Sequence, residues 1–144
     1  MRILIDADGC PVVDITVGVA RQYEVECIII CDTAHFFERD GAKTITVAKG
    51  NDSVDFVLVN MVQAGDIVVT QDYGLAAMCL ARLAVPISQN GMVYHAGNID
   101  SLLMRRYTAK KIRNAGGRLK GPAKRRVEQD EAFEQGLLQL LNKD

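Results

Sequence analysis

Hydrophobic and polar positions follow two patterns along the chain, and together they predict an α/β fold. Short apolar runs that end in turn-forming residues alternate with longer stretches whose apolar positions recur every three or four residues. The apolar runs predict strands over residues 2–5, 25–31, 43–48, 67–70 and 86–88, with a short hairpin-like addition at 91–94. Residues 25–31 are almost continuously apolar, which is typical of a strand covered on both faces of a parallel sheet.

The longer stretches predict the helices. The expected helices begin at Pro11, near Asp52, at Leu75 and at Asn98, and a last one carries Phe133, Leu137, Leu140 and Leu141 on its apolar side. The second of them should bury Val54, Val57, Leu58, Met61 and Val62. Alternating strands and helices with short links predict one domain over residues 1–144, in which helices flank a central, mainly parallel sheet in three layers.

Charge is distributed unevenly although the formal net charge is only −1. Residues 1–104 carry 13 acids and 6 bases, whereas residues 105–126 carry 10 bases and no acid. A basic helix and loop are therefore expected at about 99–126, and nucleic acid is the commonest partner of such a surface. A solvated basic helix without a ligand is the alternative explanation.

Acidic residues follow three of the expected strands. Asp6 and Asp8 end the first strand, Asp52 and Asp55 follow the third, and Asp72 follows the fourth. Because the carboxyl ends of parallel strands meet at one edge of the sheet, these side chains are expected to lie close together. Oxygen-only ligands suit hard cations such as Mg²⁺, so we expect a divalent-metal site, with helix capping as the competing explanation for each acid.

The segments that carry these acids resemble a known family. They are residues 5–12, 50–55, 66–76 and 121–122, and they are similar to segments of the bacterial YaiI/YqxD family. The resemblance covers essentially the whole chain. That family is classed as similar to PIN-type nuclease domains, whose acidic cluster binds Mg²⁺ or Mn²⁺ and cleaves RNA. The resemblance therefore implies a PIN-like fold and a metal-dependent nuclease that hydrolyses phosphodiester bonds of RNA.

The resemblance also assigns roles to single residues. It puts the first PIN-type acid at Asp6, the helix-borne acid at Asp52 or Asp55 and the later strand-end acid at Asp72, while Asp8 is an addition peculiar to the family. The carboxylates would hold one or two Mg²⁺ or Mn²⁺ ions that bind the scissile phosphate, and Asp8 would act on a metal-bound water or from outside the coordination shell. A fourth PIN-type acid has no clear counterpart here.

Other residues are candidates for contact with the nucleic acid. Thr70 and Gln71 could hydrogen-bond a phosphate. The side chains expected to neutralise backbone phosphates are Arg105, Arg106, Lys110, Lys111 and Arg113. Aromatic side chains for base stacking are scarce, with Phe36, Phe37 and Tyr107 as candidates, so base-specific recognition is not expected.

Two other functions remain open. An apolar strand followed by Asp-x-Asp-Gly also looks like the haloacid-dehalogenase phosphatases, in which Asp6 would be a covalent nucleophile, although the Ser or Thr of their second motif has no clear counterpart. The other alternative is a non-catalytic domain that binds RNA or a protein partner through its basic segment. A hydrophobic edge of the sheet would also allow a homodimer.

The remaining features concern location and cysteine chemistry. The four cysteines form no C-x-x-C pair and are expected to be buried as small hydrophobic residues. His35 and His95 lack zinc-site spacing and are expected in loops. Neither an export signal nor a run of about 18 apolar residues is present, so we expect a cytoplasmic protein without a membrane segment.

Overall fold

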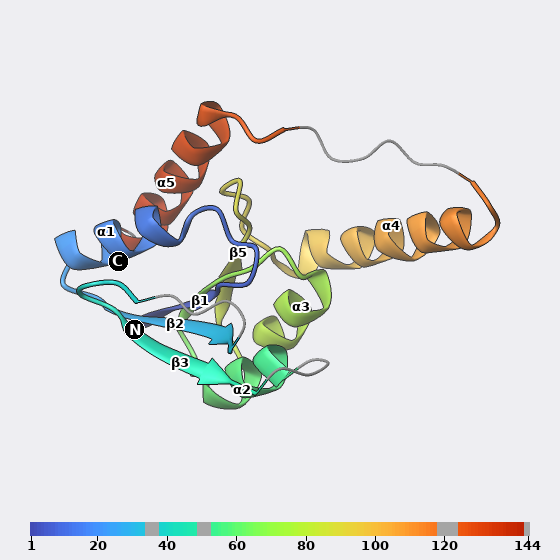
Figure 1. Cartoon of the computed structure of the whole chain (residues 1–144). Coiled ribbons are helices and arrows are strands. Elements are labelled where there is room, and N and C mark those ends of the chain that lie inside the picture. The colour runs from blue at the N-terminus through green and yellow to red at the C-terminus, as the bar shows by residue number, and fades with distance from the viewer. Residues whose placement is uncertain (34–37, 49–52, 118–123, 143–144) are drawn as a thin grey trace.

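The structure is a computed structural model that describes residues 1–33, 38–48, 53–117 and 124–142. Strands and helices alternate along most of it (Figure 1). The strands are β1 (Arg2–Asp6), β2 (Glu26–Asp32), β3 (Lys43–Val47), β4 (Ile67–Val69) and β5 (Val85–Ile87). The helices are α1 (Val13–Gln22), α2 (Ser53–Met61), α3 (Tyr73–Ala81), α4 (Ala96–Asn114) and α5 (Val127–Leu141).

The strands form one sheet in the order β3-β2-β1-β4-β5. Every pair of neighbouring strands in it is parallel, with Ile5 opposite Ile29 on one side and Val69 on the other. The α/β fold with a parallel sheet is therefore confirmed. The expected addition at 91–94 is reduced to a single antiparallel bridge between Ile87 and Val93.

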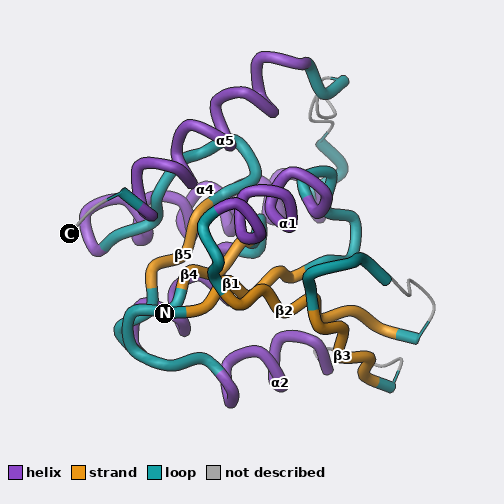
Figure 2. The backbone as a smooth tube through the Cα atoms, turned by 90° about the vertical axis from the view of Figure 1, so that its left-hand side faces the viewer, coloured by secondary structure: helices purple, strands orange, loops and turns teal. Residues whose placement is uncertain are grey.

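Helices cover both faces of the sheet and give the domain three layers (Figure 2). On one face, Ile3 and Ile5 pack with α1 and with Phe133 of α5. On the other face, Leu4 packs with Leu58 of α2 and with apolar residues of α3. This division follows from the alternation of side chains along β1, which sends successive residues to opposite faces.

Three helices begin at residues other than those expected. α1 begins at Val13 rather than at Pro11, and α3 begins at Tyr73 rather than at Leu75 because the Asp72 side chain accepts a hydrogen bond from the backbone N–H of Leu75. In α4 the N-cap is His95, and Asn98 occupies the third helical position, where its Oδ1 accepts from the backbone N–H of His95 at 2.9 Å. Asn98 therefore takes part in the cap as the third helical residue and not as the N-cap itself.

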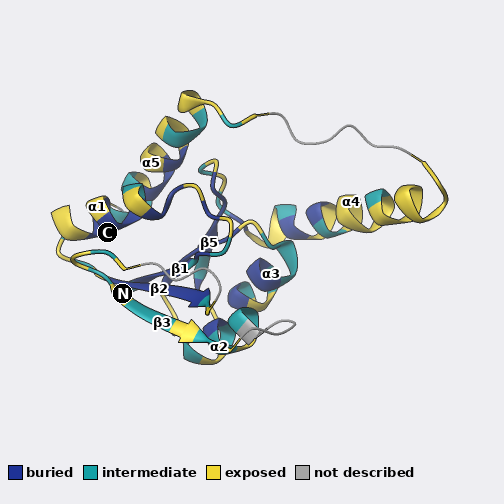
Figure 3. Cartoon of the chain, in the orientation of Figure 1, coloured by how far each residue is buried: buried dark blue, intermediate teal, exposed yellow. Residues whose placement is uncertain are grey.

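α4 packs on the domain through its first turns and then extends away from it (Figures 1 and 3). Ile99 and Leu102 are its buried residues, and they pack beside Ala76 of α3 and Tyr94. The basic residues expected along this helix lie on its exposed part: Arg105, Arg106, Lys110, Lys111 and Arg113. Nζ of Lys111 lies 5.2 Å from the ring centroid of Tyr107, which is 55% exposed.

The start of α5 is held against the turn that follows β5. Arg125 donates to the backbone O of Gln89 at 2.6 Å and to Oδ1 of Asn90 at 3.0 Å. Gly91 has φ +88°, and a Cβ built there would lie 2.3 Å from the backbone O of Ala132. Only glycine permits both this conformation and this approach.

At the amino end of the sheet, Asp66 is 2% exposed and joins β1 to the start of β4. It accepts hydrogen bonds from the backbone N–H of Arg2 at 3.0 Å, from that of Gln63 at 2.9 Å and from the Arg2 guanidinium at 2.7 Å. Burial acts to raise the pKa of Asp66, but these hydrogen bonds outweigh it, so the pKa lies below its ordinary value.

The cysteines and the hydrophobic segments agree with the expectations from the sequence. All four cysteines lie buried as free thiols, and burial raises the pKa of the Cys10 thiol to about 11, which makes it a poor nucleophile at neutral pH. None of the helices in the described ranges combines the length and the apolar character that a membrane span requires.

Several residues named from the sequence lie outside the described ranges: His35, Phe36, Phe37, Asp52 and the pair 121–122.

Candidate functional site

The carboxyl edge of the sheet brings two of the expected acids together through a shared neighbour. β1 ends at Asp6 and lies beside β4, which leads into Thr70. The buried hydroxyl of Thr70 donates to Oδ2 of Asp6 at 2.8 Å and accepts from the backbone N–H of Asp72 at 3.0 Å. Tyr94 fixes the same residue by donating from its hydroxyl to the Thr70 carbonyl at 3.2 Å. The Thr70 hydroxyl thus links the Asp6 carboxylate to the backbone of Asp72.

The carboxyl group of Asp6 has a raised pKa. Burial raises that pKa from 3.8 to about 6; the Thr70 hydrogen bond opposes the rise, and the negative charges of Asp72 and Asp8 add to it. A carboxyl group with this pKa is half-protonated near pH 6 and would become fully ionised if a cation arrived. A perturbed carboxyl group at the end of a parallel strand is a frequent property of functional sites.

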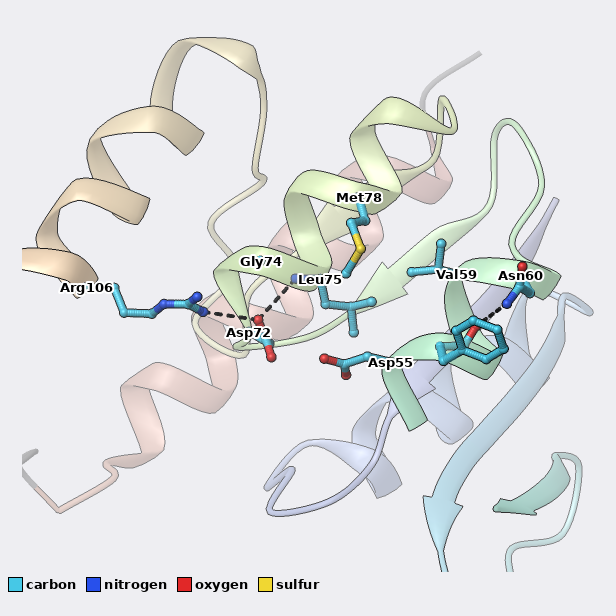
Figure 4. Close-up of a pocket in the computed structure, with 9 residues that line it drawn as sticks. Asp55, Val59, Asn60, Asp72, Gly74, Leu75, Met78 and Arg106 are labelled. Atoms are coloured by element: carbon cyan, nitrogen blue, oxygen red, sulfur yellow. Dashed lines mark hydrogen bonds and ion pairs between the residues drawn. The ribbon is translucent and has the colours of Figure 1, made fainter. Parts of the chain in front are cut away.

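A pocket of about 530 Å³ opens beside Asp72, between α2 and α3. In Figure 4 the carboxylates of Asp55 and Asp72 point toward each other across it. Its apolar lining includes Phe56, Val59, Leu75 and Met78. Pockets that join apolar walls to a few polar groups are the usual binding sites for small molecules and nucleotides.

Arg106 of α4 reaches the same pocket. Its Nη1 lies 3.5 Å from Oδ1 of Asp72, the oxygen that also accepts from the backbone N–H of Leu75 at 3.1 Å. The side chains of Arg106 and Asp72 are 57% and 39% exposed, so their ion pair contributes little to stability. A guanidinium held so weakly can exchange Asp72 for a phosphate oxygen at low cost.

Three further residues named from the sequence, Asp8, Thr70 and Gln71, hydrogen-bond to other parts of the chain. Oδ1 of Asp8 accepts a long hydrogen bond of 3.4 Å from the backbone N–H of Asp32, the last residue of β2. Gln71 is exposed, and its Oε1 accepts from the backbone N–H of Gln89 at 2.8 Å. Thr70 is fully buried, and its hydroxyl holds Asp6 in place.

The donor set matches a hard divalent cation in kind. In the part of the chain that the structure covers, no three His, Cys, Asp or Glu side chains form a ready metal-binding group. Mg²⁺ is commonly held by one or two carboxylates, with waters and substrate phosphates as its remaining ligands. Asp55 and Asp72, which face each other across the pocket, are a carboxylate pair of the kind that this mode of binding uses.

Sequence reasoning missed the apolar side of the pocket. Phe56 is 72% exposed and Met78 is 45% exposed, although both are large hydrophobic residues. The signal was present for Phe56, because it falls outside the apolar stripe expected for α2. Of that stripe, Leu58 and Val62 are buried and the other residues are partly buried: Val54, Val57 and Met61.

Comparison with known proteins places the chain in a family. Residues 4–143 match the model described as uncharacterized BCR, YaiI/YqxD family. The chain is 57% identical over 141 residues to a UPF0178 protein of Exiguobacterium sibiricum, covering 98% of this chain and 96% of the relative. It is 52% identical over 141 residues to a UPF0178 protein of Ruminiclostridium cellulolyticum, covering 98% and 92%. No solved structure matches it. The chain therefore belongs to the YaiI/YqxD family of uncharacterised bacterial proteins.

Proposed function

We propose that the protein is a divalent-metal-dependent phosphodiesterase that hydrolyses RNA at the pocket between α2 and α3. The observation that carries the proposal is a set of acids at neighbouring positions: the Asp6 carboxylate and the backbone N–H of Asp72 both bond to the Thr70 hydroxyl, and Asp55 faces Asp72 across the pocket. Capping of α3 accounts for Asp72 but not for Asp6, which ends β1, and Asp55 faces Asp72 across the pocket.

The proposal gives each acid a role as a cation ligand. Asp6 and Asp72 would hold Mg²⁺ or Mn²⁺ from the sheet edge, and Asp55 from α2. A cation bound there would neutralise phosphate charge and lower the pKa of a bound water. Thr70 keeps the Asp6 carboxylate in position, and Asp8 contributes negative charge beside it.

The basic part of α4 would bind the RNA backbone. Arg106 lies at the pocket and would contact the phosphate nearest to the carboxylates. The exposed cations farther along the helix would contact neighbouring phosphates: Arg105, Lys110, Lys111 and Arg113. Their contacts would position the strand without reading its sequence.

Cleavage of mixed single-stranded RNA, followed with Mn²⁺, Mg²⁺ and EDTA, tests the proposal. We expect cleavage only with the metals, and a loss of more than about 100-fold in Asp6→Asn and Asp72→Asn, because even outer-shell partners of metal ligands cost 10–100-fold. Asp100→Asn changes an exposed acid of α4 that does not line the pocket and is the matched control. Calorimetric Mn²⁺ titration of each variant reports ligand loss without relying on turnover.

Three outcomes would overturn the proposal. Full cleavage by Asp6→Asn and Asp72→Asn would remove the carboxylates from the reaction. RNA binding that is unchanged in EDTA, with no cleavage under any condition, would indicate a non-catalytic RNA-binding domain. Turnover of an aryl phosphate alone, with a trapped phospho-aspartate at Asp6, would indicate the phosphatase chemistry instead.

A further inference from the structure

The pocket between α2 and α3 has an apolar wall that phosphodiester hydrolysis does not need. Phe56 and Met78 line it while remaining 72% and 45% exposed, and Val59 completes the wall. The opposite face of α2 supplies the core, where Leu58 is fully buried under the sheet. Phe56 therefore contributes little to folding, and its exposure leaves a large aromatic surface in water beside the acids.

The charged side chains of the pocket are unevenly distributed along it. In Figure 4, Arg106 and Asp72 lie at one end, and Val59 and Asn60 lie at the other. Asp55 lies between these ends and directly precedes Phe56 in α2. A ligand that fills the pocket must therefore present an anionic group at one end and a flat or apolar group at the other.

We infer that the apolar wall binds a nucleobase of single-stranded RNA, stacked on Phe56, while the adjoining phosphate lies at the carboxylate end near Arg106. This inference rests on the proposed function and names its substrate class. A nucleotide has the required division into phosphate and planar base, and aromatic side chains stack on any base.

The inference excludes intact duplex RNA as the preferred substrate. In an A-form helix the bases are stacked on one another and the faces are closed to side chains. A base can reach Phe56 only from a single strand or after leaving its stack, at a cost that is least for bases that are already unpaired. Stacking is tolerant of base identity, so the site selects unpaired strands rather than a sequence.

Binding of short labelled RNA by fluorescence anisotropy, with Ca²⁺ as the divalent cation, tests the inference. The ligands are a single strand, the same strand with abasic sites in place of its bases, and its duplex. The variants are Phe56→Ala, Phe56→Trp and, as a matched control, Leu83→Ala, which truncates a residue that is 73% exposed and outside the pocket.

We expect Phe56→Ala to weaken binding of the single strand by about 5- to 150-fold, the range for loss of one stacked base. Its affinity for the abasic strand should stay unchanged, because that ligand has no base to stack. Phe56→Trp and Leu83→Ala should bind like the wild type. Thermal unfolding of Phe56→Ala should match that of the wild type, since the side chain is exposed.

Contrary outcomes separate this inference from the proposed function. Equal single-strand affinity of Phe56→Ala and wild type overturns the inference and leaves metal-dependent cleavage untouched. An equal loss for intact and abasic strands, or a preference for duplex, also overturns it. A Phe56→Ala variant whose molar mass in solution changes while RNA binding does not would show a contact between copies of the chain. Failure of the wild type to bind any RNA overturns both proposals.

Discussion

Replacing Asp6 with asparagine should stabilise the metal-free protein at alkaline pH. The folded state raises the pKa of Asp6 from 3.8 to about 6, chiefly by burial. Between these two values the folded state binds more protons than the unfolded state, so stability falls as pH rises. The contribution of protonated Asp6 is fully present below pH 3.8 and is lost above about pH 6. Asparagine remains neutral throughout and can still accept the Thr70 hydrogen bond.

The size of the effect follows from the shift. A difference of about two pKa units corresponds to about 3 kcal/mol at pH 8, because each unit is worth 1.36 kcal/mol. Asp6 is partly exposed, which lets water screen the charge. We therefore expect Asp6→Asn to be more stable than the wild type by about 1–3 kcal/mol at pH 8 and equal to it near pH 4.

Urea unfolding of both proteins in EDTA, followed across pH 4–8, measures this difference directly, because titration of the other carboxyl groups cancels between them. Asp100→Asn should show no such dependence on pH. Adding Mn²⁺ at pH 8 should stabilise the wild type by ligand linkage and leave Asp6→Asn nearly unchanged. A difference that stays constant with pH, or an Asp6→Asn variant less stable than the wild type at pH 8, would refute the reasoning.

Three further predictions concern the rest of the fold and α4. Asp66→Ala should lower the free energy of unfolding by about 3 kcal/mol, measured in urea at pH 7, because it leaves the partly buried Arg2 guanidinium without its partner. This loss of stability should shrink as pH falls through the pKa of the Asp66 carboxyl group, and a loss that stays constant with pH would contradict the prediction. Gly91→Ala should cost more than about 1 kcal/mol by calorimetry because of its φ of +88° and the contact with α5, whereas Gly18→Ala, which has open space, should be neutral or stabilising. Replacing both Lys110 and Lys111 with glutamine should reduce the salt dependence of single-strand RNA binding, expressed as a log–log slope, by about 1.4, and an unchanged slope would show that these lysines do not contact phosphates.

The parallel sheet could be predicted from the sequence because its strands are buried on both faces. The apolar runs of β1, β2 and β4 contain little else than aliphatic residues, so periodicity identifies them and their parallel pairing together. The starts of α3 and α4 were misplaced by a few residues. Asp72 was assigned from the sequence as a metal ligand, but it is the N-cap of α3. His95, the N-cap of α4, is a residue type that is uncommon at that position.

Part of the candidate site could also be predicted, namely the acids. A sequence pattern with parallel strands is enough to expect Asp6 and Asp72 at one edge of the sheet, whereas the pairing of β1 with β4 was not predicted. The hydrogen bonds that join Thr70 to Asp6 and Asp72 were not expected, because the sequence does not show which groups a threonine hydroxyl at a strand end will bond. The apolar wall was missed because the exposure of Phe56 depends on how α2 packs, which the apolar stripe shows only indirectly.

The sheet order has a consequence for how the domain is made. β1 precedes every other described strand, yet it occupies the centre of the sheet, between β2 and β4. Its second neighbour is complete only when synthesis has passed Val69, and the Thr70 hydroxyl that holds Asp6 follows directly. Pairing across so long a segment is slow and leaves an unpaired strand edge open in the meantime. We expect nascent chains halted before β4 to be cut readily by protease near β1, and chains that extend beyond β5 to resist it.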